Sequence, residues 1–66
     1  MKNTLRIQRA IANLTQAELA EKIGVSRQTI NAMESAKYVP STVLALKLAT
    51  VFGKKVEEIF ELEEGD

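Results

Sequence analysis

The chain has 66 residues, a length that allows a single domain with one small core. It contains no cysteine and no histidine, which excludes disulfides, thiol or imidazole catalysis and the common zinc sites. No apolar stretch is long enough for a signal peptide or a membrane span. We therefore expect a soluble, cytoplasmic protein without a metal or other cofactor, and without an evident small-molecule ligand.

Nine basic and nine acidic side chains give a formal net charge of zero, but they are unevenly distributed. Residues 1–56 hold all nine basic side chains and three acidic ones, a net charge of +6. The remaining acids form the C-terminal end, residues 57–66: Glu57, Glu58, Glu61, Glu63, Glu64 and Asp66. The basic part suits contact with a nucleic acid while the acidic end points away. A solvated acidic terminus without a partner explains the composition equally well.

Helical periodicity dominates the chain and predicts an all-α fold of five helices in one domain, residues 1–66. The first helix is expected over residues 4–12, ending at Asn13, which tolerates the left-handed conformation. The second begins at Thr15, where Thr15-Gln16-Ala17-Glu18 has the form of a capping box, and it ends before Gly24.

Ser26 offers the next N-cap, for a helix over residues 27–35. Residues 37–40 are expected to be extended because they lead into a proline, and Ser41 caps a fourth helix that ends before Gly53. A last helix over residues 56–60 leads into Glu61-Leu62-Glu63, whose alternation fits either a short strand or a frayed end. The predicted core comprises Leu5, Leu14, Leu19, Ala20, Ile23, Val25, Ile30, Met33, Leu44, Leu48, Val51, Phe52, Ile59 and Phe60.

Residues 16–35 have the pattern of a helix-turn-helix. Two helices that cross steeply across a short turn need a small side chain where their axes approach, and Ala20 supplies it. The turn needs a residue free to adopt positive φ, and Gly24 is such a residue. Hydrogen-bonding side chains then protrude from the second of these helices, where a merely solvated face would be rich in Glu and Lys.

Arg27, Gln28, Thr29 and Asn31 are these protruding side chains, and they suit the reading of base edges. Arginine matches the two acceptors of guanine, an amide matches adenine, and the threonine methyl group can touch thymine. Residues 27, 28 and 31 share one face of the first turn and a half, the end of a recognition helix that enters the major groove. Taken singly, each of these residues is ordinary solvated surface, and only the turn pattern before them favours DNA contact.

From Leu5 to Phe60, and most specifically from Leu14 to Lys37, the sequence resembles the Xre family of phage repressor and Cro-like regulators. The resemblance implies a compact repressor-like fold, base contacts by the three residues just named, and phosphate or groove-edge contacts by Thr29, Lys37 and Tyr38. It also implies that Gln16 contacts the DNA backbone and supports the base-reading residues. The candidate DNA-binding residues are Gln16, Ser26, Arg27, Gln28, Thr29, Asn31, Lys37 and Tyr38.

The resemblance further implies an internal ion pair between Arg9 and Glu34, with a structural role. Two features depart from the family pattern. Ala36 stands where a glycine is usual, so the end of the recognition helix is expected to be either strained or differently shaped. Gln8 replaces a usual apolar residue, while Ile7 and Ile11 form an apolar pair that marks either altered packing of the first helix or a second contact surface.

Our leading hypothesis is a transcriptional regulator that binds double-stranded DNA at an inverted repeat as a homodimer. The fourth and fifth helices are expected to form the dimer surface, with Val51, Val56, Ile59 or Leu62 as contacts. Family members of this length include both repressors and activators. The alternative is an antitoxin-like or other protein-interaction module that uses the acidic end or the Ile7–Ile11 pair. An enzyme is disfavoured because the chain lacks His and Cys, a Gly-rich loop that could hold a phosphate, and room for a pocket.

Overall fold

The structure is a computed structural model that describes residues 1–66. Three of its helices begin after a residue whose hydroxyl group caps the helix. Thr15 Oγ1 accepts from the backbone N–H of Glu18 at 3.0 Å, and the Glu18 carboxylate accepts from the Thr15 N–H at 2.9 Å, which confirms the capping box. Ser26 and Ser41 cap in the same way. The helices are α1 (Leu5–Ile11), α2 (Gln16–Ile23), α3 (Arg27–Glu34), α4 (Thr42–Phe52) and α5 (Val56–Ile59).

Residues in the left-handed conformation follow α1, α2 and α3. Gly24 has a φ of 76°, and this conformation turns the chain from α2 into α3 as the sequence predicts. Asn13, after α1, has a φ of 57°, again as predicted. Ala36, after α3, has a φ of 60°, so the expected strain at this position is confirmed. The backbone needs the conformation here because the N–H of Lys37 donates to the carbonyl of Ala32 at 2.9 Å, closing the last turn.

Replacing Ala36 by glycine is expected to stabilise the protein by about 1 kcal/mol, because the Cβ atom is unfavourable at positive φ. Thermal unfolding followed by circular dichroism checks this, since about 1 kcal/mol raises the Tm of a domain of this size by roughly 4–8 °C. Ala10→Gly is the matched control: Ala10 is exposed inside α1, where glycine costs about 0.5–1 kcal/mol. Destabilisation by both changes would contradict the strain at Ala36.

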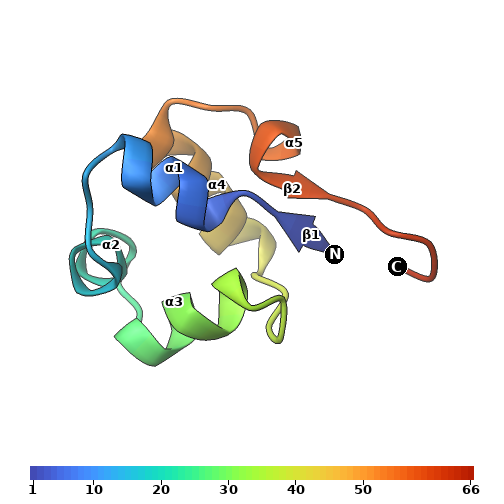
Figure 1. Ribbon diagram of the computed structural model, residues 1–66, viewed down its shortest axis with the longest axis horizontal. Coiled ribbons are helices and arrows are strands. Elements are labelled where there is room, and N and C mark those ends of the chain that lie inside the picture. The colour runs from blue at the N-terminus through green and yellow to red at the C-terminus, as the bar shows by residue number, and fades with distance from the viewer.

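The core lies where α2 and α3 cross and where α4 packs against them (Figure 1). Ala20 is 3% exposed at this crossing, as its small side chain predicts. The nine residues that are buried as a whole are all apolar and belong to the predicted core: Leu5, Leu19, Ala20, Ile23, Ile30, Met33, Leu48, Ile59 and Phe60. The other predicted members pack around them and are partly buried: Leu14, Val25, Leu44, Val51 and Phe52.

Two short strands join the ends of the chain. β1 (Lys2–Asn3) pairs antiparallel with β2 (Phe60–Glu61), with Lys2 opposite Glu61 and Asn3 opposite Phe60. The strand at the C-terminal end therefore begins one residue before the Glu61-Leu62-Glu63 stretch that the sequence marked as strand or frayed end. The expected helix over 56–60 stops at Ile59 because Phe60 is extended, and the N–H of Thr4 donates to the Ile59 carbonyl at 2.8 Å.

Ile59 is 1% exposed, so its predicted place in a dimer surface is wrong. The apolar periodicity of a helix as short as α5 does not separate a side chain that faces the core from one that faces outward. The remaining candidates stay accessible, since Val51 and Val56 are half-buried and Leu62 is exposed.

No helix of the structure has the length and apolar character needed to cross a membrane.

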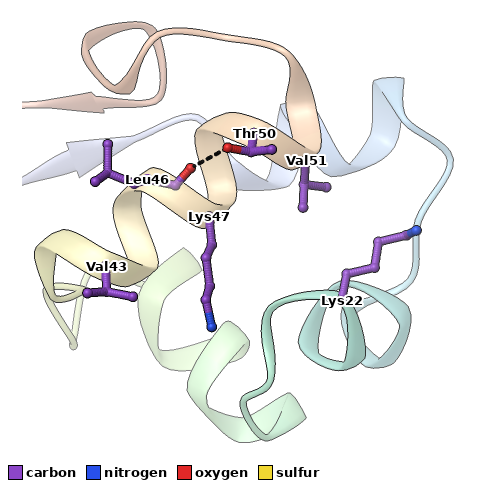
Figure 2. Close-up of a pocket in the computed structure, with 6 residues that line it drawn as sticks. All are labelled: Lys22, Val43, Leu46, Lys47, Thr50 and Val51. Atoms are coloured by element: carbon purple, nitrogen blue, oxygen red, sulfur yellow. Dashed lines mark hydrogen bonds between the residues drawn. The ribbon is translucent and has the colours of Figure 1, made fainter.

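An open hollow of about 410 Å³ lies between α2 and α4, and Figure 2 shows its lining. The Lys47 side chain extends from α4 toward the α2–α3 pair, and its Nζ lies 3.5 Å from the carbonyl of Ile23 at the end of α2. Thr50 Oγ1 donates to the carbonyl of Leu46 at 3.0 Å within α4. A cation at the C-terminal end of α2 is favourable because the last carbonyls of a helix have no partner within it. Lys47 therefore links α4 to the helix-turn-helix.

Candidate nucleic-acid interface

The first turn and a half of α3 presents three polar side chains to solvent together. Arg27, Gln28 and Asn31 are all exposed, and at 100° per residue they share one side of the helix. Ile30 and Met33, on the opposite side, are 0% and 1% exposed. The core thus holds α3 by its apolar face and leaves the predicted base-reading face outward.

Ser26 and Thr29 shape the start of α3. Ser26 Oγ accepts from the backbone N–H of Thr29 at 3.2 Å, and the two hydroxyl oxygens lie 3.0 Å apart. Ser26 is exposed and Thr29 is half-buried. Both residues therefore fix the beginning of the helix at the place where it would approach DNA, with their hydroxyl groups already engaged within the protein.

Gln16, the first residue of α2, connects α2 to α3. Its Nε2 donates to Asn31 Oδ1 at 3.3 Å and to Glu34 Oε1 at 3.1 Å. The sequence resemblance implied that Gln16 supports the base-reading residues, and the structure places its amide against Asn31, one of the residues predicted for that role. The two hydrogens of Nε2 are both directed to these contacts.

Glu34, the last residue of α3, has a fully buried side chain that receives two arginines from α1. Arg9 Nε and Nη2 donate to its carboxylate at 2.7 and 3.3 Å, which confirms the predicted ion pair. Arg9 also donates to the carbonyl of Leu14 at 3.0 Å. Arg6 Nε lies 3.6 Å from Glu34 Oε1, a contact that the sequence analysis missed, although Arg6 lies one helical turn before Arg9.

Two opposing effects act on the Glu34 carboxyl. Burial by itself raises its pKa, but hydrogen bonds from Arg9 and Gln16, together with the charges of Arg9 and Arg6, outweigh burial. The pKa of Glu34 therefore lies below its ordinary value of 4.5, and the group is ionised at neutral pH.

Lys37 and Tyr38 follow the left-handed Ala36 in the loop after α3. Both residues are exposed at the surface, Tyr38 by 42%. At the same end of α3, Asn3 Nδ2 donates to the carbonyl of Met33 at 2.8 Å. The sequence analysis missed this contact because no local signal links the two residues.

The acidic C-terminal end lies away from the α2–α3 turn (Figure 1). The ammonium group of Met1 lies 3.0 Å from Glu63 and 3.2 Å from Asp66, so part of the negative charge is paired within the protein. Hydrogen bonds from the ammonium group to these two side chains raise its pKa above 8.0.

Comparison with known proteins assigns this arrangement to a family. A family profile described as helix-turn-helix matches residues 5–59. The chain belongs to the Xre-like helix-turn-helix family. Its members are transcriptional regulators and not a class of enzyme, and membership implies DNA binding. The resemblance described from the sequence is confirmed.

Relatives of this helix-turn-helix protein match it over nearly its whole length. An uncharacterized HTH-type transcriptional regulator of Methanocaldococcus jannaschii is 56% identical over 66 residues and covers 100% of both chains. A second one, YgzD of Bacillus subtilis, is 47% identical over 64 residues and covers 97% of both chains.

Solved structures of helix-turn-helix proteins have the same fold. The restriction-modification controller protein C.AhdI of Aeromonas hydrophila is 34% identical with a TM-score of 0.76, covering 85% of each chain. The SOS-response transcriptional repressor LexA of Eubacterium rectale is 29% identical with a TM-score of 0.79, covering 94% of this chain and 66% of its own. The predicted five-helix, repressor-like fold is confirmed, and the short β1–β2 pair is an addition to it.

Proposed function

We propose that this protein is a sequence-specific transcriptional regulator that inserts α3 into the major groove of double-stranded DNA. One observation carries the proposal: the core fixes α3 through Ile30 and Met33, so that Arg27, Gln28 and Asn31 project together from its first turns. Guanidinium and amide groups match the hydrogen-bonding edges of guanine and adenine in that groove.

The other candidate residues surround this face and suit backbone contacts. Lys37 and Tyr38 lie exposed in the loop after α3, where an ammonium and a phenol can contact phosphates. Ser26 and Thr29 lie at the helix start. The side-chain amide of Gln16 donates within the protein. We therefore assign the contact of Gln16 with the DNA backbone to its main-chain N–H, in the first turn of α2.

We also propose that the protein binds an inverted repeat as a homodimer through α4 and α5. An apolar hollow of about 260 Å³ lies at this face, with Val39 and Leu46 exposed at 60% and 56%. Val56, a predicted dimer contact, is part of the lining: Met1, Val39, Pro40, Thr42, Ala45, Leu46, Val56 and Phe60. A two-fold axis at this face would pair identical apolar patches and present two recognition helices to successive major grooves, about 34 Å apart.

Selection of bound sequences from a pool of random DNA duplexes tests this function. We expect enrichment of a two-fold symmetric site whose halves are about one helical turn apart. Enrichment of a single half-site would contradict the dimer, and no enrichment would contradict sequence-specific binding.

A pool without enrichment would instead favour the second candidate, a protein-interaction module. The observation behind that candidate is the exposure of Ile7 and Ile11 on α1, at 60% and 73%. These two apolar side chains are not covered by other parts of the protein, and an exposed apolar pair can form a contact surface for a partner.

A further inference from the structure

A line of hydrogen bonds joins the buried side chain of Glu34 to the exposed Asn31 through Gln16. The chemical nature of the groups fixes which of them donates at each step. The Glu34 carboxylate is ionised, so its oxygens only accept. Arg9 donates to it at 2.7 Å, and Arg6 lies 3.6 Å away, so these two cations keep the group charged and in place.

The Gln16 side chain is the middle of this line. The atom of its amide that lies 3.1 Å from Glu34 has to be the donor Nε2, because a carboxylate cannot donate to the amide oxygen. The same Nε2 lies 3.3 Å from the Asn31 amide, so the Asn31 atom that faces it has to be the acceptor Oδ1. Each amide is thereby held in one of its two orientations.

Asn31 then presents a defined group to its surroundings. Its Oδ1 is directed to Gln16, which leaves the Nδ2 hydrogens as the donors that point away from this contact. In the major groove, guanine offers N7 and O6 as acceptors and thymine offers O4, whereas cytosine offers an N4 donor. Adenine offers both kinds of group and does not distinguish the two orientations of the amide.

We infer that Glu34 is a positioning residue for base recognition: through Gln16 it fixes Asn31 as a donor, so that the protein selects an acceptor-bearing base at the position Asn31 contacts. The inference rests on the proposed function of α3. The ion pair with Arg9 by itself gives the Glu34 carboxylate a role in folding, and the inference adds a role in base specificity. It also predicts which change reverses the preference.

Exchanging the two residues, Gln16→Glu with Glu34→Gln, keeps the composition and net charge and reverses the line. The new carboxylate at position 16 only accepts, so it draws Nδ2 of Asn31 toward itself and turns Oδ1 outward. The amide at position 34 still accepts from Arg9 and donates to position 16. The exchanged protein should therefore prefer the donor edge of cytosine where the wild type prefers guanine or thymine.

The test repeats selection from random duplexes with three proteins: wild type, the exchange variant and Asn31→Ala. The alanine variant identifies the base position that depends on Asn31. At that position we expect about a 10-fold wild-type preference for guanine over cytosine, which lies within the range for a good base contact, and a reversed preference in the exchange variant. Loss of fold alone lowers binding at every position and reverses none.

Gln16→Met is the second variant, because it leaves the Arg9–Glu34 pair intact and removes the two hydrogen bonds of the Gln16 amide, to Glu34 and to Asn31. We expect its preference at this position to fall to about 2-fold, with the other positions unchanged. Failure of the wild type to enrich any site overturns the proposed function and the inference with it. An enriched site whose preference is the same in the wild type, the exchange variant and Gln16→Met overturns the inference alone.

Discussion

Replacing Ile30 by alanine is expected to destabilise the protein by about 2–5 kcal/mol, the usual cost of removing a large aliphatic side chain from a core. Ile30 is 0% exposed and holds α3 to the rest of the domain. A chain of this length has a free energy of unfolding on the order of 3–10 kcal/mol, so this one change removes a large part of it. Chemical denaturation followed by circular dichroism measures the loss.

Ile11→Ala is the matched control, since it makes the same replacement at a side chain that is 73% exposed. We expect its effect on the free energy of unfolding to stay within about 0.5 kcal/mol, as for most surface substitutions. Equal losses at Ile30 and Ile11 would show that Ile11 is also covered, as in a protein whose α1 packs against a second copy in solution.

The second large effect is expected for Gln28→Ala, which should weaken binding to the selected DNA site by about 1–3 kcal/mol. The side chain is exposed on the outer face of α3, so its removal leaves the core intact. Binding to unrelated DNA should change little, because charge neutralisation of phosphates dominates that binding. Fluorescence anisotropy with the selected duplex and a scrambled duplex, at one salt concentration, gives both affinities.

Lys37→Ala provides the contrasting change for this measurement. Loss of a phosphate contact should weaken binding to both duplexes alike and lower the slope of log affinity against log salt by about 1. A Gln28→Ala protein that behaves in this same way would reject base reading by Gln28.

The sequence predicts the helices well where their ends depend on neighbouring residues. These ends depend on residues within about one turn of each other along the chain: the capping box of Thr15 and Glu18, the caps at Ser26 and Ser41, and the left-handed Gly24. The buried residues can also be predicted from the sequence, because the apolar face of an amphipathic helix packs against the core.

Contacts between distant residues are less visible in the sequence. The pairing of β1 with β2 and the hydrogen bond from Asn3 to Met33 join segments that no periodicity relates. The burial of Ile59 depends on the angle at which a single turn of helix meets α4. In the candidate interface, the sequence predicted the exposed face of α3 and, by resemblance, the Arg9–Glu34 pair, but not the orientation of the amides of Gln16 and Asn31, which side-chain rotamers decide.

The position of Glu34 limits how this protein can adapt to its target. One carboxylate is shared by Arg6 and Arg9 of α1 and by Gln16 of α2, while it belongs to α3 itself. This carboxylate therefore ties three helices together before any DNA is bound, so in the proposed complex little conformational entropy would be lost in setting their relative angles. On the proposed inverted repeat, the double helix would have to supply the remaining fit, so the width and bendability of the duplex between the half-sites would become part of what is selected.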